Sequence, residues 1–236
     1  MALTEIMSRN SVEIDGFAVV DSVISSTEIE VWRELVAGIE GRGVSKRESI
    51  FAIRNLLDVP EIRDMARSLA VRNLIEPTLG PNCFAVRGIF FDKTPDANWK
   101  VPYHQDLSIA VREKIETPGF GPWSEKAGAV HVQPPTAVLE KMLTIRIHLD
   151  DTDEANGALR VIPGSQRLGK IESGHVAREA EQGEVAVPVV EGGAMLMRPL
   201  LLHASSPARN ARHRRVIHLE FAGTELSGEL EWLNRV

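Results

Sequence analysis

The residues with the clearest chemical potential are an imidazole and a carboxylate two positions apart, His104 and Asp106, at the end of an apolar segment. In an extended strand, residues i and i+2 point to the same side, so both side chains would reach into one space. Two histidines and one carboxylate form the facial triad that holds non-haem Fe(II) and leaves positions open. The pair therefore predicts two thirds of such a site, although a capped turn or a satisfied polar pair gives the same spacing.

The histidine that we expect to complete the triad is His203, which closes the apolar segment 195–202. An arginine at the start of a strand antiparallel to the His203 strand would return to the same cavity. A guanidinium group binds a carboxylate through two parallel hydrogen bonds, which suits a dicarboxylate co-substrate. A surface salt bridge is the competing interpretation. Position alone does not choose among the arginines that follow, which are Arg209, Arg212, Arg214 and Arg215.

The elements that must position these residues begin with a mainly helical support over residues 1–82. The turn and β-branched residues at 15–20 predict a short strand, and the serines and threonine at 25–27 are helix N-cap candidates. Apolar residues recur at helical spacing over 29–39 and 60–79, which predicts two helices. Gly41 and Gly43 are expected to end the first of them.

From residue 83 the pattern changes to short strands separated by turns. Helices followed by many short strands favour a β-sandwich or barrel braced by helices, in a single domain of 236 residues. Strands are expected at 83–92, around 101–107, and at 142–150, 159–165, 184–190, 194–202 and 214–221.

The strand at 142–150 has one polar face, because Thr144, Arg146 and His148 alternate with aliphatic residues. If the aliphatic face packs on helices, the polar face lines the cavity. Arg146 would then bind the second carboxylate of a dicarboxylate, or an anionic substrate. An exposed edge strand would show the same alternation. Arg87, inside an otherwise apolar strand, is a candidate substrate contact on the same reasoning.

The segment 108–141 contains several prolines and glycines and resists a regular assignment. A loop of this length within a compact domain is usually functional, and its place after the His104 strand predicts a lid. Trp123 in this segment and Tyr103 beside His104 are candidate substrate contacts, although a loop tryptophan more often anchors its own loop.

Composition limits the class of protein. The chain is 43% apolar with a net charge of −6, and it has no long basic stripe, so nucleic acid is not an expected partner. A single cysteine, Cys83, excludes an intrachain disulfide and fits a reducing cytosol. No apolar run reaches the roughly 18 residues that span a bilayer, and we expect no secretory signal. These features predict a cytoplasmic monomer or homodimer that acts on a small molecule.

Taken together, the motifs resemble the phytanoyl-CoA dioxygenase family of Fe(II)/2-oxoglutarate oxygenases. The resemblance implies a mainly β fold with a helical N-terminal layer, namely a double-stranded β-helix (jelly-roll, cupin-like) core over 83–222 with a lid-like insert at 108–141. The matching pieces, in chain order, are Asp-Gly-Phe-Ala-Val-Val at 15–20, His-Gln-Asp-Leu at 104–107, Leu-Asp-Asp at 149–151 with Asn-Gly-Ala-Leu at 156–159, Val-Ile-Pro-Gly-Ser at 161–165, and His203-Ala204-Ser205 with Arg214.

The resemblance also implies roles for residues. His104, Asp106 and His203 would hold Fe(II), and Arg214, eleven residues after His203, would bind the distal carboxylate of 2-oxoglutarate together with Ser205. With O2, the implied reaction is hydroxylation of a small molecule with release of succinate and CO2. Position 166 is Gln where the family pattern has His, and the segment 108–141 is longer than in simple members. The substrate, acyl-CoA in particular, therefore does not carry over.

Two other classes of function stay open at this point. One is a metal-dependent isomerase or hydrolase on a cupin-like barrel, in which the metal acts as a Lewis acid. It would need no 2-oxoglutarate and would leave Arg214 without a task. The other is a non-catalytic binding or sensing protein on the oxygenase fold, against which the intact set of ligand residues argues.

Overall fold

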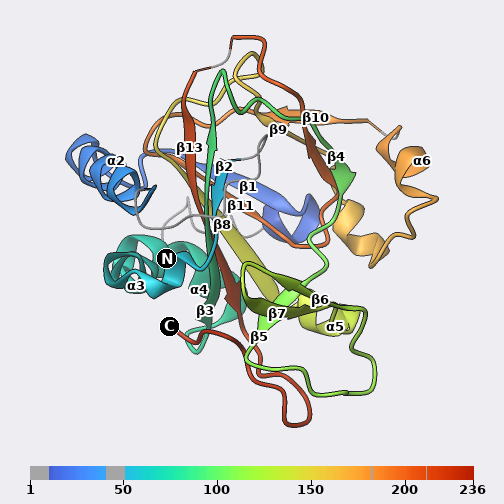
Figure 1. The fold of residues 1–236 in the computed structure, drawn as a ribbon. Helices are drawn as coiled ribbons and strands as arrows, with labels where there is room; N and C mark the ends of the chain where they lie inside the picture. The colour runs from blue at the N-terminus through green and yellow to red at the C-terminus, as the bar shows by residue number, and fades with distance from the viewer. Residues whose placement is uncertain (1–10, 41–50, 182, 211) are drawn as a thin grey trace.

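The computed structural model describes residues 11–40, 51–181, 183–210 and 212–236. Most of its strands belong to two antiparallel sheets (Figure 1). Strands that are distant in the chain are neighbours in the larger sheet, as the predicted jelly-roll core requires. Its six strands lie in the order β1 (Phe17–Val20), β11 (Ala194–Met197), β8 (Met142–His148), β13 (Arg214–Ala222), β3 (Phe84–Lys93) and β2 (Phe51–Ile53).

The smaller sheet packs against one face of the larger one. A buried apolar cluster joins Leu159, Val161 and Val187 of the smaller sheet to Met195 and Met197 of β11. Side chains on the two inner faces therefore point into the same region. Within the smaller sheet the order is β10 (Val185–Val187), β9 (Leu159–Val161), β12 (His203–Ser205) and β4 (Val101–His104); the β9–β10 connection contains η2 (Ser165–Leu168) and α6 (Val176–Ala180).

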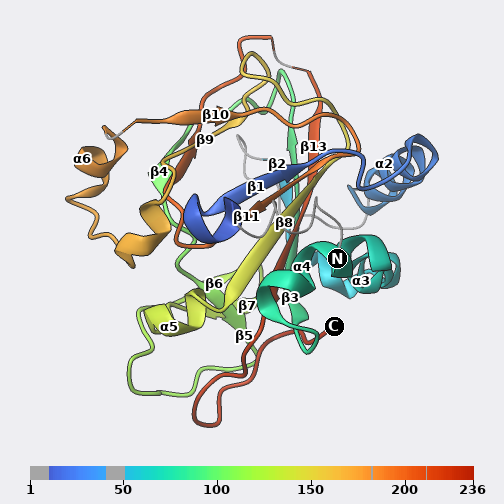
Figure 2. The same ribbon diagram turned by 180° about the vertical axis from the view of Figure 1, so that it is seen from behind.

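A helical layer covers the other face of the larger sheet, as Figures 1 and 2 show from opposite sides. Alternate residues of β8, including Ile145 and Ile147, are fully buried against it. Full burial of such a side chain stabilises the fold by about 1.5–3 kcal/mol. The described residues include no helix long and apolar enough to cross a membrane. The layer consists of α2 (Ser26–Glu40), η1 (Leu56–Asp58), α3 (Pro60–Arg67) and α4 (Leu69–Leu79).

The predicted helices are confirmed with one correction. Ser25 begins α2 through a capping box, since its backbone N–H donates to Glu28 Oε2 (2.8 Å) and its hydroxyl accepts from Glu28 N (3.3 Å). The segment predicted as one helix over 60–79 is two helices, because Ser68 is extended and its hydroxyl accepts from Val71 N (3.4 Å) to cap α4. Gly41 and Gly43, expected to end α2, lie outside the described residues.

The predicted single strand over 194–202 is wrong. β11 ends at Met197, and a turn carries the chain from the larger sheet to the smaller one, where His203 begins β12. Arg198 N still donates to Gly16 O (2.8 Å), just before β1, and the chain then turns, with Leu201 N donating to Arg198 O (3.0 Å). Pro199 has no N–H group and cannot continue a ladder, so the continuous apolar run conceals a change of sheet.

The segment 108–141 was expected to be irregular, and that expectation is wrong. It contains a third sheet and a short helix at one end of the molecule (Figure 1). Its strands have only three or four residues each, too few for a period to be read from the sequence. The elements are β5 (Ile109–Val111), β6 (Trp123–Lys126), β7 (Ala129–Val132) and α5 (Thr136–Leu139), with sheet order β5-β7-β6.

Candidate active site

The smaller sheet brings the predicted triad together from two neighbouring strands. His104 at the end of β4 pairs with His203 at the start of β12, and Asp106 follows β4 with its N–H bonded to Pro199 O (2.9 Å). Between the two ligand positions, Gln105 points elsewhere and anchors the turn through its amide, which donates to Leu200 O (2.7 Å). The backbone is thus fixed on both sides of Asp106.

The three side chains have the geometry of a metal site. One ligand atom from each of His104, Asp106 and His203 lies within 4.8 Å of the others. His104 Nε2 and His203 Nε2 each lie 3.8 Å from an oxygen of Asp106. Both Nδ1–H groups donate to the carbonyl two residues earlier, Pro102 O and Leu201 O (2.9 Å each). These bonds fix the tautomer, so both Nε2 lone pairs face the shared centre.

The protonation states also suit metal binding. Burial lowers the pKa of His203 to about 4, so the imidazole is neutral at physiological pH. Burial by itself would raise the pKa of Asp106, but His203, His218 and His104 together hold it well below its ordinary value. Two neutral imidazoles and one carboxylate with open positions are the donor set of non-haem Fe(II).

On the facing inner surface of the larger sheet lie three buried cations. Lys93 and Arg214 are paired across β3 and β13, and Arg146 on β8 pairs with His218 of β13. Their partners are neutral: Lys93 Nζ donates to Ser205 Oγ (3.0 Å) and Ser206 O (2.6 Å), Arg146 Nη1 donates to His218 Nδ1 (3.0 Å), and Arg214 Nη1 donates to Gly157 O. Among the described residues, no carboxylate forms an ion pair with any of the three. We call Lys93, Arg146 and Arg214 the cation cluster.

The cation cluster is electrostatically unfavourable in isolation. Burial, with Arg214 and Arg146 nearby, lowers the pKa of Lys93 to about 7. Burial lowers the pKa of Arg146 to about 10 and, with Arg146 adjacent, that of Arg214 to about 9. Buried charges are normally paired, because desolvation costs several kcal/mol for each ion. Cations collected without a carboxylate indicate a place for an anionic ligand.

Unpartnered polar atoms in the same region support this interpretation. The Nε atoms of Arg146 and Arg214, His148 Nε2 and Thr144 Oγ1 are buried without a hydrogen-bond partner. Gly157, with φ +79°, passes so close that a Cβ there would lie 3.3 Å from Lys93 Nζ. Only glycine fits this conformation without strain. The residues therefore fit a dicarboxylate such as 2-oxoglutarate, and they fit Fe(II) at the triad.

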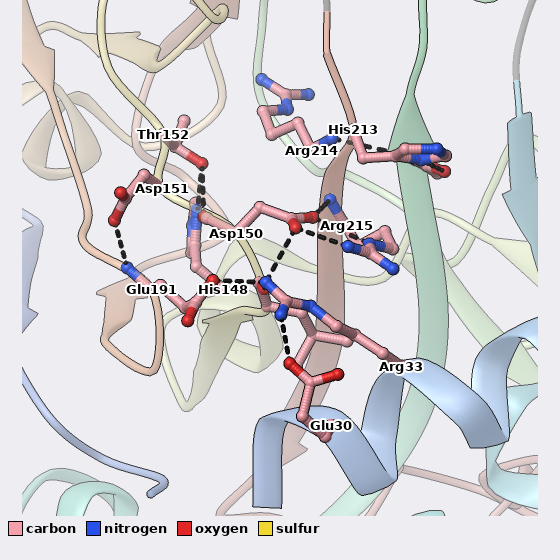
Figure 3. A network of polar contacts seen from close by, with 12 residues as sticks. Glu30, Arg33, His148, Asp150, Asp151, Thr152, Glu191, His213, Arg214 and Arg215 are labelled. Atoms are coloured by element: carbon pink, nitrogen blue, oxygen red, sulfur yellow. Dashed lines mark hydrogen bonds and ion pairs between the residues drawn. The ribbon is translucent and has the colours of Figure 1, made fainter. Parts of the chain in front are cut away.

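Arg214 is positioned through its backbone. Asp92 Oδ1 accepts from Arg214 N (3.2 Å), and Asp150 Oδ2 accepts from Arg215 N (2.8 Å) and Arg215 Nε (2.9 Å). Asp150 Oδ1 also binds Arg33 Nη2 of α2 (3.0 Å), which ties the start of β13 to the helical layer. Figure 3 shows Arg215 directed toward Asp150 while Arg214 points away from it. Arg215 therefore forms its ion pair on the outer face of the larger sheet, whereas the Arg214 side chain lies on the inner face.

One part of the Arg214 prediction is wrong. β13 does not pair with the His203 strand; it pairs with β3 and β8 in the larger sheet. Arg214 nevertheless shares a site with His203 because the two sheets pack face to face. Arg146 and Ser205 lie on the inner faces as expected, and both are buried.

The three proposed substrate contacts lie in different places. Arg87 is on the inner face of β3, where its Nε donates to Glu220 (2.9 Å), and it lowers the pKa of Asp106. Tyr103 donates its hydroxyl to Glu184 (2.5 Å) on the face of β4 opposite His104, which does not favour substrate contact. Trp123 packs with the apolar cluster around Phe120 and Val132. Their roles in binding stay predictions.

Sequence reasoning did not identify Lys93, because the strand was predicted to end at Asp92. β3 continues one residue further than predicted, so Lys93 lies on the same face as Arg87 and Phe91. The alternation Arg87, Ile89, Phe91, Lys93 would have indicated this position, because residues two apart share a face.

Comparisons with known proteins agree with this geometry. The family model for phytanoyl-CoA dioxygenase matches residues 12–216. No curated protein matches the chain. Among solved structures, AviO1 from Streptomyces viridochromogenes is similar at 21% identity (94% of this chain, 96% of that chain, TM-score 0.67). The epimerase SnoN of nogalamycin biosynthesis, in complex with Fe3+, alpha ketoglutarate and nogalamycin RO, is similar at 16% identity (98% and 94%, TM-score 0.73). EctD from S. alaskensis with 2-oxoglutarate and 5-hydroxyectoine is similar at 16% identity (94% and 76%, TM-score 0.70).

Proposed function

Because the chain belongs to the phytanoyl-CoA dioxygenase family, whose members are Fe(II)- and 2-oxoglutarate-dependent oxygenases, we propose that it hydroxylates a small organic molecule and releases succinate and CO2. Family membership makes it an oxidoreductase that uses iron, 2-oxoglutarate and O2. The observation that carries the proposal is the position of the triad opposite the cation cluster. A metal site beside buried cations with no carboxylate partner suits a co-substrate that chelates the metal and carries two negative charges.

We assign the residues as follows. His104, Asp106 and His203 hold Fe(II) through Nε2, a carboxylate oxygen and Nε2. Arg214, Ser205 and Lys93 bind the distal carboxylate of 2-oxoglutarate, and Arg146 neutralises the carboxylate nearer the metal. Lys93 already donates to Ser205 Oγ, so the two form one binding surface. One N–H of the Arg214 guanidinium, on Nη1, donates to Gly157 O. Its other N–H groups, including the unpartnered Nε, can donate to a carboxylate.

When bound, iron and 2-oxoglutarate supply the oxidising chemistry: O2 is consumed, 2-oxoglutarate becomes succinate and CO2, and one oxygen atom enters the substrate. The chain itself orients these partners. The carbonyls of Pro102 and Leu201 orient both imidazoles with Nε2 toward the metal position, and the apolar residues between the sheets keep water from the buried side of the site.

The test begins with binding. Anaerobic calorimetry should show that 2-oxoglutarate binds the protein loaded with Fe(II), and that His203→Ala abolishes this binding. Succinate release in air, measured across metabolite pools, then identifies a substrate. A protein that binds neither metal at the triad nor 2-oxoglutarate would refute the proposal.

The product decides which oxidation takes place. SnoN is an epimerase and SnoK, also of nogalamycin biosynthesis, is a carbocyclase, and both are alpha ketoglutarate dependent. Mass spectrometry separates the outcomes, since hydroxylation adds one oxygen, epimerisation leaves the mass unchanged and oxidative ring closure removes two hydrogens. A product without added oxygen would replace hydroxylation and keep the cofactor assignment. Turnover without 2-oxoglutarate would favour the Lewis-acid isomerase or hydrolase instead.

A further inference from the structure

The inner face of the larger sheet has two differently charged ends. Along the β13–β3 pair, Arg214 lies opposite Lys93 at one end and Glu220 opposite Arg87 at the other. Glu220 is six positions after Arg214, and a strand rises about 3.4 Å per residue, so the ends are roughly 20 Å apart. Ser205, two residues after His203, accepts from Lys93 Nζ (3.0 Å), and Ser108, two residues after Asp106, accepts from Lys126 Nζ (3.1 Å), so the triad lies between these two lysines. The end of the inner face at Arg87 therefore takes no part in the proposed binding of 2-oxoglutarate.

The third sheet presents a polar face at that end. In the register of its strands, Ser124 pairs with His131 and His131 with Ala110, so these residues share one face with Lys126. The opposite face carries Trp123, Val132 and Ile109 and packs into an apolar cluster. Lys126 Nζ donates to Ser108 Oγ (3.1 Å), and Ser108 is two residues after Asp106. The polar face of this sheet therefore adjoins the metal ligands.

Lys126 is a half-buried cation without a carboxylate partner among the described residues. Its one hydrogen bond is to a neutral hydroxyl. Burial lowers its pKa, and Arg87 and Arg54 lower it further, while Asp106 and Glu220 act in the opposite direction. Burial and the neighbouring cations therefore destabilise the charged form of Lys126, and a bound anion would offset that destabilisation.

The acidic groups nearby are already engaged. Glu220 Oε1 accepts from Arg87 Nε (2.9 Å) and from His218 Nε2 (3.1 Å). Asp106 is a metal ligand in the proposed site. His131 adds no negative charge, because burial lowers its pKa and its Nδ1–H donates to Ala129 O (3.0 Å). Among the described residues, no carboxylate therefore pairs with Lys126, and its charge is available to an anionic ligand.

We propose that Lys126 forms a subsite for an anionic group of the organic substrate, a carboxylate or a phosphate, next to the metal. This inference rests on the proposed function and names the class of its substrate. The 2-oxoglutarate carboxylates are assigned to the opposite end of the inner face, so the two anions do not compete for the same cations. A substrate held at Lys126 would approach the metal from the side of Asp106 and His104, which are more exposed than His203.

The test uses pairs of small probes that differ in charge: benzoate with benzamide, and phenyl phosphate with phenol. Each is titrated into the protein loaded with Zn(II) and 2-oxoglutarate, which prevents turnover, and binding is followed by NMR. We expect at least one anion to bind tenfold or more tightly than its neutral partner, about 1.4 kcal/mol. The better anion tells whether the subsite prefers carboxylate or phosphate.

Variants connect the preference to the residue. Lys126→Met should abolish the preference for the charged probe, and Lys126→Arg should retain it. Lys126→Gln is a second neutral variant in case Lys126→Met does not fold. Lys141→Met is the matched control, because Lys141 belongs to the same segment, is exposed at the surface and lies outside 112–122. It should change nothing.

Three results would overturn the inference: equal binding of charged and neutral probes, no binding of either anion at millimolar concentration, or a preference that survives in Lys126→Met. A weaker affinity for 2-oxoglutarate in Lys126→Met would also overturn it, because Lys126 would then belong to the co-substrate. Failure of the proposed function is recognised separately, since the wild-type protein would then not bind 2-oxoglutarate at all.

Discussion

Binding of 2-oxoglutarate should depend on pH through Lys93. In the ligand-free protein, burial and the neighbouring arginines lower the pKa of Lys93 from its ordinary 10.5 to about 7. A bound carboxylate favours the charged form and returns the pKa toward its ordinary value. Below pH 7 the ammonium is present before and after binding, so the affinity is constant. Above pH 7 binding must take up a proton, so the affinity falls as the pH rises.

The magnitude follows from the shift. Each pKa unit corresponds to about 1.36 kcal/mol, so between pH 7 and pH 8 the Kd for 2-oxoglutarate should rise up to about tenfold. The nearby His148 and His218 do not interfere, because burial lowers the pKa of both imidazoles below the ordinary value and they stay neutral above pH 7. Arg146 and Arg214 stay charged at neutral pH.

Calorimetry in buffers of different ionisation enthalpy counts the protons directly. We expect uptake near zero at pH 6 and approaching one proton per 2-oxoglutarate by pH 8 in the metal-loaded protein. Lys93→Met should bind more weakly and show a flat pH profile. If Lys93→Met takes up the same proton as the wild type, or if the wild type takes up none at pH 8, the assignment of Lys93 to the carboxylate is wrong.

Three further predictions concern other parts of the site. Arg214→Lys keeps the charge but loses the planar guanidinium, so calorimetry should show roughly tenfold weaker 2-oxoglutarate binding. Arg215→Lys should weaken it much less. A larger loss in Arg215→Lys than in Arg214→Lys would show that Arg215, not Arg214, binds the carboxylate. His104→Ala should abolish metal binding and succinate release with little change in melting temperature, because this side chain is 39% exposed, and a large loss of stability would contradict that. If 108–141 acts as a lid, hydrogen exchange at 112–122 should slow when substrate and 2-oxoglutarate are added, while protection that follows protein concentration alone would indicate an oligomer interface.

The sequence predicted those parts of the site that lie in short motifs. His104 and Asp106 could be found because two positions along an extended chain fix their relative direction, and His203 because it ends a long apolar run. The change of sheet at 198–202 could not be found in the same way, because apolar residues suit either sheet. Pro199 was the one local signal for it. The pairing of β13 with β8 and β3 depends on contacts between distant segments, which local spacing does not contain.

Lys93 and Lys126 were missed for a related reason. Each ends a strand, where the alternating pattern stops and a lysine reads as a solvated loop residue. Their significance is that no carboxylate among the described residues pairs with them, and this becomes visible only when distant strands are placed together. The same argument applies to Trp123, which the sequence offered as a candidate substrate contact or as an anchor of its own loop and which lies on the apolar face of its sheet.

The use of carboxylates around Arg214 explains how the site keeps its charge for a ligand. Asp92 and Asp150 lie within hydrogen-bonding distance of β13, yet Asp92 accepts from the backbone N–H of Arg214 and from His213 Nδ1 (2.7 Å), and Asp150 accepts from Arg215. Neither carboxylate forms an ion pair with the Arg214 guanidinium, whose one bond is to the neutral carbonyl of Gly157. The strand is therefore held in register by acids on its outer side, while the inner cation stays available. An acid that paired with Arg214 directly would fix the side chain equally well, but 2-oxoglutarate would then have to displace it.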